Sequence, residues 1–387
     1  MKRKGHGFKQ SMVKLLGSGK NQDLRIALFC ILLSLFAGSL LLLSLGKNPL
    51  IAYKSILQGA GFWPKARYAG HKSMLTDFLS LLNYATPMVF ASLSVAVALR
   101  CGLFNICVPG MMIFSGFLAT VLVGYSGLPS FGARFLVIIV GIVGGSFIGS
   151  VIGYLKFKFN TNEVVVSIMF NYIISYVVSF FIQTKYIDPT TRQSLKIGDN
   201  ARLTLVDKVI GNLKIEIPLV LPLAILVVVG LWFLFARSRL GFELKAVGMN
   251  RKASRYAGVD VGRTMVISMI ISGALAGLAG VSYYLGCYAS IQPKVLPSLG
   301  FDAIAVALLG NSSPVGCLFA SLLVMTISNG TTYMSSTLNV LREIASLITG
   351  ILLLFSACSA FFKVQANRWA QELEDEYIVN MREAPHE

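Results

Sequence analysis

The residues best able to do chemistry in this chain are polar side chains that lie inside long apolar segments. Asn105 is one of them, and Pro109 and Gly110 follow it in a segment that otherwise predicts an apolar helix. Backbone interrupted in this way is tolerated at membrane depth only where it is buried in protein or lines a cavity. Asn105 is therefore a candidate for a polar pathway through the molecule, to which it would contribute hydrogen bonds.

Other polar residues begin or interrupt further apolar segments. Asn162 and Glu163 begin one of them, where a capping pair at a helix N-terminus and a role in the pathway are equally open interpretations. Asn171 and Tyr172 lie about two turns further along the same segment. Asp302 begins a weakly apolar segment, and we expect it at a helix end because a single charge at the bilayer centre costs at least ~3 kcal/mol. These five residues complete the set of pathway candidates.

No constellation for catalysis or metal binding accompanies these residues. The chain lacks a GxxxxGK[ST] phosphate loop, an HExxH motif and a GxSxG motif, and its three His lie outside the apolar segments. The six Cys form no CxxC pair and lie in or beside apolar segments, where we expect free thiols. We therefore expect a protein that is not an enzyme, holds no metal or cofactor, and hydrolyses no ATP itself.

A basic stretch at 237–264 predicts a short helix outside the apolar segments. Asn250 is a good N-cap, Gly258 is a good stop, and RKASRYA lies between them. So short a helix is marginal in water and needs a partner to hold it. Two interpretations apply, a positively charged inner loop and a docking element, and the capping at both ends favours docking.

Composition defines the elements that must position all these residues. The chain has 387 residues, of which 55% are hydrophobic and only 13% charged, with a mean hydropathy of +0.71. The net charge of +17 lies in short clusters between uncharged runs, whereas a nucleic-acid-binding protein needs a basic solvated face. This composition excludes a soluble enzyme, a disordered tail and a disulfide scaffold, and it predicts an all-α polytopic membrane protein.

About ten segments are long and apolar enough to predict transmembrane helices, and β-strands are excluded because the runs do not alternate. The segments are Ile26–Leu45, Phe78–Leu99, Gly102–Tyr125, Phe135–Leu155, Val164–Gln183, Pro218–Phe235, Met265–Leu285, Ser298–Gly310, Val315–Tyr333 and Ile344–Phe362. The eighth is too short to span unless it begins near Val295 or is broken. Ten spans place both termini on one side, and 20 of the 34 Lys and Arg then fall on the inner side.

These spans divide the chain into an inner N-terminal segment (1–25), a membrane domain (26–362) and an inner C-terminal tail (363–387). The outer loop 184–217 contains alternating stretches around Ile210 that favour a β-hairpin, which receives an external partner or only covers the bundle. Glycines recur every four residues within two spans, and we favour close helix packing over a gating hinge. The recurring glycines are Gly145, Gly149 and Gly153, and Gly273 and Gly277.

Four segments resemble the permease subunits of bacterial ABC importers of the ribose and branched-chain amino acid class, and they are most similar to its nucleoside-type branch. They are 102–110 (GLFNICVPG), 162–172 (NEVVVSIMFNY), 241–258 (GFELKAVGMNRKASRYAG) and 300–310 (GFDAIAVALLG), in family order. The resemblance covers about residues 75–360, and its third segment is the most specific, since in this family it forms the coupling helix that contacts the ATPase. The residues it assigns to coupling are Glu243, Asn250, Arg251, Ala253, Arg255, Tyr256 and Gly258.

The resemblance implies a type II-like permease of ten helices with an inverted repeat, in the bacterial cytoplasmic (inner) membrane with both termini in the cytoplasm. Two permease subunits, commonly different chains, would line the pathway. A separate cytoplasmic ATPase would use ATP and Mg, and an extracytoplasmic lipoprotein related to the basic membrane lipoproteins would deliver the substrate. Nucleosides are the substrate that the resemblance implies.

One departure from the family pattern bears on the substrate. The family has Val-Glu-Gly-Gln after the Gly-Leu-Phe-Asn-Ile element, whereas this chain has Val108, Pro109, Gly110 and Met111. An importer permease for ribose, another sugar or an autoinducer-like solute is therefore an alternative. A secondary transporter coupled to ions or protons is a weaker one, because such carriers usually need several intramembrane acids or His.

Overall fold

The computed structural model describes residues 11–16, 22–68, 70, 72–210 and 213–383. The turn expected at Gly211 and Asn212 lies outside them, as do His6, His71, His386 and most of the expected N-terminal segment. The longer helices, in chain order, are α2 (Gln22–Ser44), α3 (Pro49–Gly59), α4 (Met74–Arg100), α5 (Val108–Ala119), α6 (Ser130–Phe159), α7 (Glu163–Phe181), α8 (Leu221–Arg237), α9 (Arg239–Met249), α10 (Arg251–Tyr256), α11 (Val261–Val281), α12 (Ser298–Leu309), α13 (Pro314–Leu338), α14 (Arg342–Ala357) and α15 (Ser359–Glu383). The all-α membrane class expected from the sequence is confirmed.

The helices match the apolar segments of the sequence, although not all of them are long enough to cross a membrane. Seven helices of the described part are long and apolar enough to span, or eight if the bent pair α8 and α9 forms one span. The two remaining segments fold as short apolar helices, 108–124 and α12. The count of ten spans therefore stays a prediction, and the eighth segment is short, as its sequence indicated. Helix α3 was not expected.

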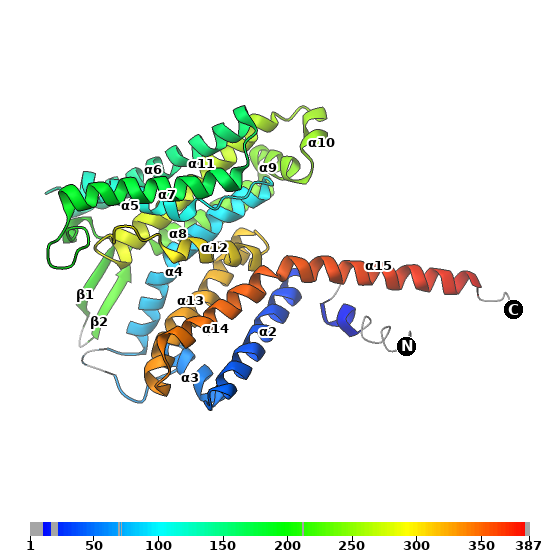
Figure 1. The fold of residues 1–387 in the computed structure, drawn as a ribbon, viewed down its shortest axis with the longest axis horizontal. Helices are drawn as coiled ribbons and strands as arrows, with labels where there is room; N and C mark the ends of the chain where they lie inside the picture. The colour runs from blue at the N-terminus through cyan, green and yellow to red at the C-terminus, as the bar shows by residue number, and fades with distance from the viewer. Residues whose placement is uncertain (1–10, 17–21, 69, 71, 211–212, 384–387) are drawn as a thin grey trace.

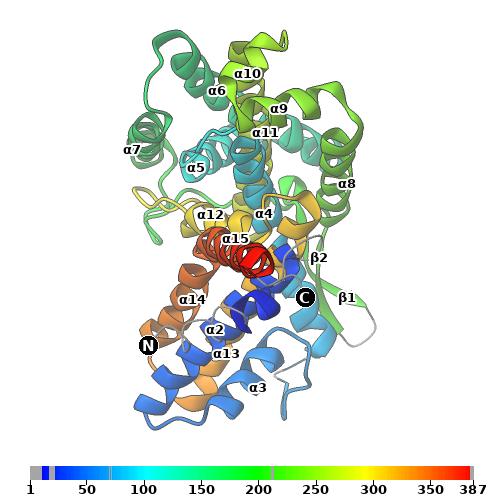
Figure 2. The same ribbon diagram turned by 90° about the vertical axis from the view of Figure 1, so that its right-hand side faces the viewer.

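Helices α4–α7 and α11–α14 make matching contacts, as an inverted repeat requires. The first helix of each set packs on the third helix of the other, α4 on α13 and α11 on α6. Each short second helix, α5 or α12, contacts the third and fourth helices of its own set and the first helix of the other. Figure 2 shows α4 and α12 between an upper layer that contains α5, α6, α7 and α11 and a lower layer that contains α2, α3, α13 and α14.

The recurring glycines hold α6 and α11 together. A Cβ on Gly145 would overlap the carbonyl of Gly273, and a Cβ on Gly277 would overlap the carbonyl of Gly141. Helices approach this closely only where neither carries a side chain, and close approach replaces the hydrophobic driving force that lipid does not supply. The packing interpretation of these glycines is therefore confirmed.

The expected β-hairpin is formed by β1 (Thr204–Ile210) and β2 (Leu213–Pro218). The loop before it is bound by backbone hydrogen bonds to three short π-helical turns that end α5, α7 and α11. These turns are η1 (Thr120–Gly124), η2 (Ile182–Tyr186) and η4 (Ser282–Cys287). Gly198 donates to Gly124, Leu195 to Tyr186 and Leu203 to Leu285, at 3.1, 2.8 and 3.0 Å. The hairpin and this loop form one end of the bundle, and α10 lies at the other (Figure 1).

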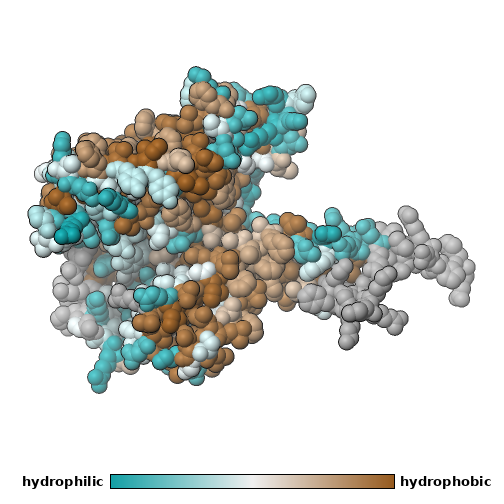
Figure 3. Space-filling model, in the orientation of Figure 1, coloured by the Kyte–Doolittle hydropathy of each residue, from teal (hydrophilic) through white to brown (hydrophobic). Residues whose placement is uncertain are grey.

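The surface agrees with a membrane location. Large apolar side chains are exposed along α2, α6, α7 and α8, and the apolar surface covers both layers in Figure 3, whereas α10 and the coloured part of α15 beyond the bundle are mainly hydrophilic. Helix α15 extends beyond the bundle at the end where α10 lies (Figure 1). It is joined to α2 there through a hydrogen bond from Gln22 Nε2 to Asn367 Oδ1, 2.6 Å long.

Candidate functional site

The broken segment at 102–110 is braced inside the bundle by two of the pathway candidates. Asn105 donates to Ser272 Oγ at 2.8 Å and accepts from the amide of Cys107 at 2.9 Å. Asn171 accepts from the amide of Gly110 at 2.8 Å and donates to the carbonyl of Ile106 at 2.9 Å. Both side chains are buried and use their polar atoms within the subunit, so their pathway role stays a prediction.

The other candidates near this segment are separated from one another. Tyr172 is exposed on the outer surface of α7. Asn162 caps α7 through the amide of Val164 at 3.0 Å, and Glu163 forms an ion pair with Lys156 at 2.9 Å. Asn162 therefore makes the hydrogen bond that the capping interpretation requires, and Glu163 lies in the first turn of the helix that Asn162 caps.

The two residues that depart from the family pattern are buried in the same region. Pro109 packs on α12, where a Cβ on Gly300 would lie 2.7 Å from its Cγ. Met111 is fully buried beside Asn105. Neither lines the polar cavity at the N-terminal end of α12, so in this chain apolar side chains occupy the places of the family's Glu and Gln.

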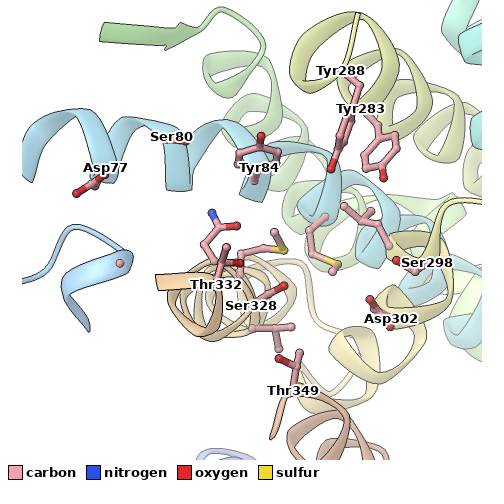
Figure 4. Close-up of a pocket in the computed structure, with 16 residues that line it drawn as sticks. Asp77, Ser80, Tyr84, Tyr283, Tyr288, Ser298, Asp302, Ser328, Thr332 and Thr349 are labelled. Atoms are coloured by element: carbon pink, nitrogen blue, oxygen red, sulfur yellow. The ribbon is translucent and has the colours of Figure 1, made fainter. Parts of the chain in front are cut away.

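The N-terminal ends of the two short helices therefore meet at Pro109 and Gly300. Short or interrupted segments in corresponding places of two repeats are the best pointer to a binding site in transporters. A polar cavity opens directly beside this junction, at the N-terminal end of α12, between α4, η4, α12, α13 and α14 (Figure 4). Among the sequence candidates, only Asp302 lines it.

The cavity consists of two adjoining lobes of about 470 and 480 Å³. Either volume falls in the range of small-molecule sites. The first, the aromatic lobe, is lined by Tyr84, Tyr283 and Tyr288, with Met88, Met325 and polar residues of α4 and α13. The second, the hydroxyl lobe, has Ser and Thr side chains as most of its lining: Ser298, Ser328, Thr331, Thr332, Ser335, Ser346 and Thr349. Asp302 lines both lobes, as do Ser298, Ser328, Thr332 and Thr349, whereas the tyrosines line only the aromatic lobe.

A π-helical turn brings two of the tyrosines together. The amide of Tyr288 donates to the carbonyl of Tyr283, five residues earlier, at 3.0 Å. In an α-helix, residues five apart point in different directions, whereas the wider π turn places them on one face. The rings of Tyr283 and Tyr288 have centroids 4.7 Å apart, and that of Tyr84 on α4 lies 6.3 Å from Tyr288. The turn thus builds a wall of aromatic rings.

Several polar groups of the hydroxyl lobe are not used by the fold. Thr331 and Ser335 donate to backbone carbonyls of their own region. Within the described residues, by contrast, the carboxylate of Asp302 has no hydrogen-bond or ion-pair partner, and neither do the hydroxyls of Ser328 and Thr349. Buried polar groups usually have partners, so a half-buried carboxylate without one indicates a place for a hydrogen-bonding ligand.

Sequence reasoning did not find most of this site. A signal existed in α13, where Ser328, Thr331, Thr332 and Ser335 recur at three- and four-residue spacing and form one polar face of an apolar helix. The tyrosines gave no such signal, because Tyr84 lies 199 positions before Tyr283 and the alignment of Tyr283 with Tyr288 depends on the π turn.

At the opposite end from the hairpin, the predicted docking helix forms α10. Asn250 caps it through the amides of Lys252 and Ala253, at 3.0 and 3.1 Å, and Gly258 follows it with a φ of +81°. Arg251 donates to the carbonyl of Gly102 at 3.0 Å, which ties α10 to the loop after α4. Glu243 pairs with Arg239 at 2.8 Å on α9.

The remaining residues of α10 leave a surface for a partner. Ala253, Arg255 and Tyr256 are exposed, and Tyr256 is 94% exposed. An aromatic side chain so fully exposed on a hydrophilic end is typical of an interaction surface. All six Cys are free thiols, as expected.

Comparison of the sequence with known proteins finds similarity to permease components of transport systems. Residues 78–357 match the family described as branched-chain amino acid transport system / permease component. The chain is 31% identical to the nucleoside ABC transporter permease protein NupB of Lactococcus lactis, over 90% of this chain and 94% of the relative. It is 34% identical to the guanosine ABC transporter permease protein NupP of Bacillus subtilis (87% and 93%), and 28% identical to the glucose ABC transporter permease protein TsgB13 of Haloferax volcanii (73% and 76%).

Proposed function

The chain belongs to the family of branched-chain amino acid transport system permease components, and we propose that within this family it conducts nucleosides. It is a multi-span permease subunit of an ABC transporter and not an enzyme, since its relatives are permeases that act with a separate ATPase and a substrate-binding partner. The two relatives that match 90% and 87% of this chain are named for nucleosides or guanosine.

The observation that supports this substrate best is the two-lobed cavity. A nucleoside has an aromatic base at one end and a hydroxylated sugar at the other. The aromatic and hydroxyl lobes offer these two chemistries next to each other. The sugar alternative is not favoured, because the relative named for glucose is 28% identical over 73% of this chain, whereas those named for nucleosides or guanosine are 31% and 34% identical over 90% and 87% of it.

Energy for transport would come from a cytoplasmic ATPase, which would hold the ATP and Mg and contact α10. Tyr256 and Arg255 support this assignment because they are exposed on a capped helix that is anchored to the bundle through Arg251. A substrate-binding lipoprotein would approach the hairpin end, and a second permease, commonly a different chain, would complete the pathway. Both termini would then lie in the cytoplasm of a bacterial inner membrane, on the side of α10.

Uptake by the reconstituted importer tests this function. Vesicles that contain this chain, its second permease and its ATPase should accumulate labelled guanosine only when ATP and the binding protein are both supplied. Tyr256→Ala should lower uptake severalfold, because it removes an exposed contact for the ATPase, whereas Tyr176→Ala, at an exposed tyrosine of α7 that is not a pathway candidate, should leave uptake unchanged. Uptake without any ATPase would contradict the proposal.

A further inference from the structure

The two lobes of the cavity differ in a way that defines how a nucleoside would lie in them. This inference rests on the proposed function and goes further by assigning the parts of the substrate. We propose that the base binds among the tyrosines of the aromatic lobe and the ribose in the hydroxyl lobe, and that Asp302 accepts hydrogen bonds from the vicinal 2′- and 3′-hydroxyls. Asp302 would therefore be the residue that selects ribonucleosides.

The aromatic lobe fits a base. The ring centroids of Tyr283 and Tyr288 lie 4.7 Å apart, and those of Tyr84 and Tyr288 lie 6.3 Å apart. Aromatic faces bind bases by stacking, and they do so without strong preference among bases because every base has a π-face. The sulfur-containing side chains Met88 and Met325, which lie in the same lobe, add adaptable apolar surface. This lobe would therefore tolerate purines and pyrimidines.

The hydroxyl lobe fits a ribose. An ionised carboxylate has two oxygens that only accept hydrogen bonds, and a vicinal diol offers two donors at matching spacing. Such charge-assisted bonds are stronger than neutral ones. Acidic side chains bind the ribose hydroxyl in dinucleotide-binding folds by the same chemistry. Asp302 lines both lobes, so it lies where a ribose must lie if its base occupies the aromatic lobe.

The surroundings of Asp302 favour this ligand over a cation. Among the described residues, Asp302 is the only carboxylate that lines the hydroxyl lobe, and no group of three or more potential metal ligands occurs among them. Asp77, the other carboxylate of the cavity, lines only the aromatic lobe and is neutralised by Lys65 at 2.7 Å. The free hydroxyls of Ser328 and Thr349 can both donate to and accept from further hydroxyl groups of the sugar.

The test measures the sugar preference of the complete importer. Uptake of guanosine, 2′-deoxyguanosine and 3′-deoxyguanosine is compared in vesicles for the wild type, Asp302→Asn and Asp302→Ala, with each nucleoside saturating the same binding protein. Because the binding protein is the same throughout, a change in preference belongs to the permease. Glu343→Gln, at an exposed carboxyl at the start of α14 outside the cavity, is the matched control.

We expect the wild type to take up guanosine about tenfold faster than either deoxynucleoside, the effect of one lost hydrogen bond to a charged group. Both Asp302 variants should reduce this ratio to about threefold or less, because guanosine loses two hydrogen bonds to the carboxylate whereas each deoxynucleoside loses only the one that it still makes, and the control should keep the ratio. Tyr288→Leu should slow all three nucleosides equally, and Tyr288→Phe, which keeps the ring, should restore them.

Two results would overturn the inference while the proposed function stands. One is an unchanged ratio in both Asp302 variants, and the other is an equal loss for all three nucleosides, which indicates a structural role. Membrane abundance and co-purification with the ATPase show whether each variant is assembled. A wild type that takes up none of the three nucleosides would overturn the proposed function itself.

Discussion

At the scale of single residues, the polar groups of this membrane protein fall into two kinds. Asn105 and Asn171 have hydrogen-bond partners for donor and acceptor alike inside the subunit, and they hold an interrupted backbone together. Asp302 has no such partner in the described part of the chain and borders a cavity. Both kinds look alike in the sequence, as polar residues in apolar segments, and only their contacts distinguish bracing from binding.

This distinction predicts that Asn171 matters for stability. Asn171→Leu removes both of its hydrogen bonds and leaves the amide of Gly110 and the carbonyl of Ile106 unpaired in the interior. An unpaired buried polar group costs about 1–3 kcal/mol, so the variant should unfold at a clearly lower temperature in detergent. Tyr172→Leu, at the exposed neighbouring position, should change the unfolding temperature little. Equal unfolding temperatures for the two variants would contradict the bracing role.

At the scale of the elements, the π turn η4 and the short helix α12 supply much of the lining of the cavity, and the long helices around them fix their positions. The π turn η4 aligns Tyr283 with Tyr288, and the loop before the hairpin fixes that turn through the bond from Leu203 to Leu285. At the base of the hairpin, Thr204 donates to Asn83 on α4 at 2.8 Å, one residue from Tyr84. The hairpin end of the molecule is thus connected directly to the aromatic lobe.

The framework for these pieces depends on the glycine contact between α6 and α11. Gly145→Ala should destabilise the protein by about 1–3 kcal/mol, because its Cβ would overlap the backbone of Gly273 and force the helices apart. Gly230→Ala is the matched control on α8, where nothing lies within 4 Å of an added Cβ. Thermal unfolding of the two variants in the same detergent measures the difference. A Gly145 variant as stable as the control would refute close packing here.

At the scale of the whole molecule, the two ends of the bundle differ in kind. The hairpin and its loop form one end, while α10 and the projecting part of α15 lie at the other (Figure 1). The apolar surface lies between them (Figure 3). A subunit of this shape can receive one partner from each side of a membrane, with the cavity between the two ends.

The orientation of the ends can be measured directly. In intact cells, an impermeant thiol reagent should label Lys196→Cys on the exposed outer loop and should not label Arg255→Cys on α10. Opened membranes should allow labelling of both. The native thiols are buried or half-buried, so the background is expected to be low. Labelling of Arg255→Cys in intact cells would reverse the proposed orientation.

The sequence by itself determined the membrane class, the location of the apolar helices, the hairpin, the free thiols and the capped helix α10. Each depends on local properties, such as the length of an apolar run, alternation, or the side chain at a helix end. The glycine spacing also predicted close packing correctly, although it did not say that α6 and α11 were partners. The alignment of the family's segments along the chain identified the class of permease.

Only the tertiary structure decided where polar groups meet. The cavity brings Tyr84 of α4 together with four residues from the C-terminal half of the chain, namely Tyr288, Asp302, Ser328 and Thr349. Its aromatic wall depends on a π turn, which the periodicity of the sequence does not predict, and its volume depends on how α12, α13 and α14 pack. The sequence gives the chemical type of each residue, but the fold decides whether its polar atoms already have hydrogen-bond partners. Within the described residues, Asn171 has such partners and Asp302 does not.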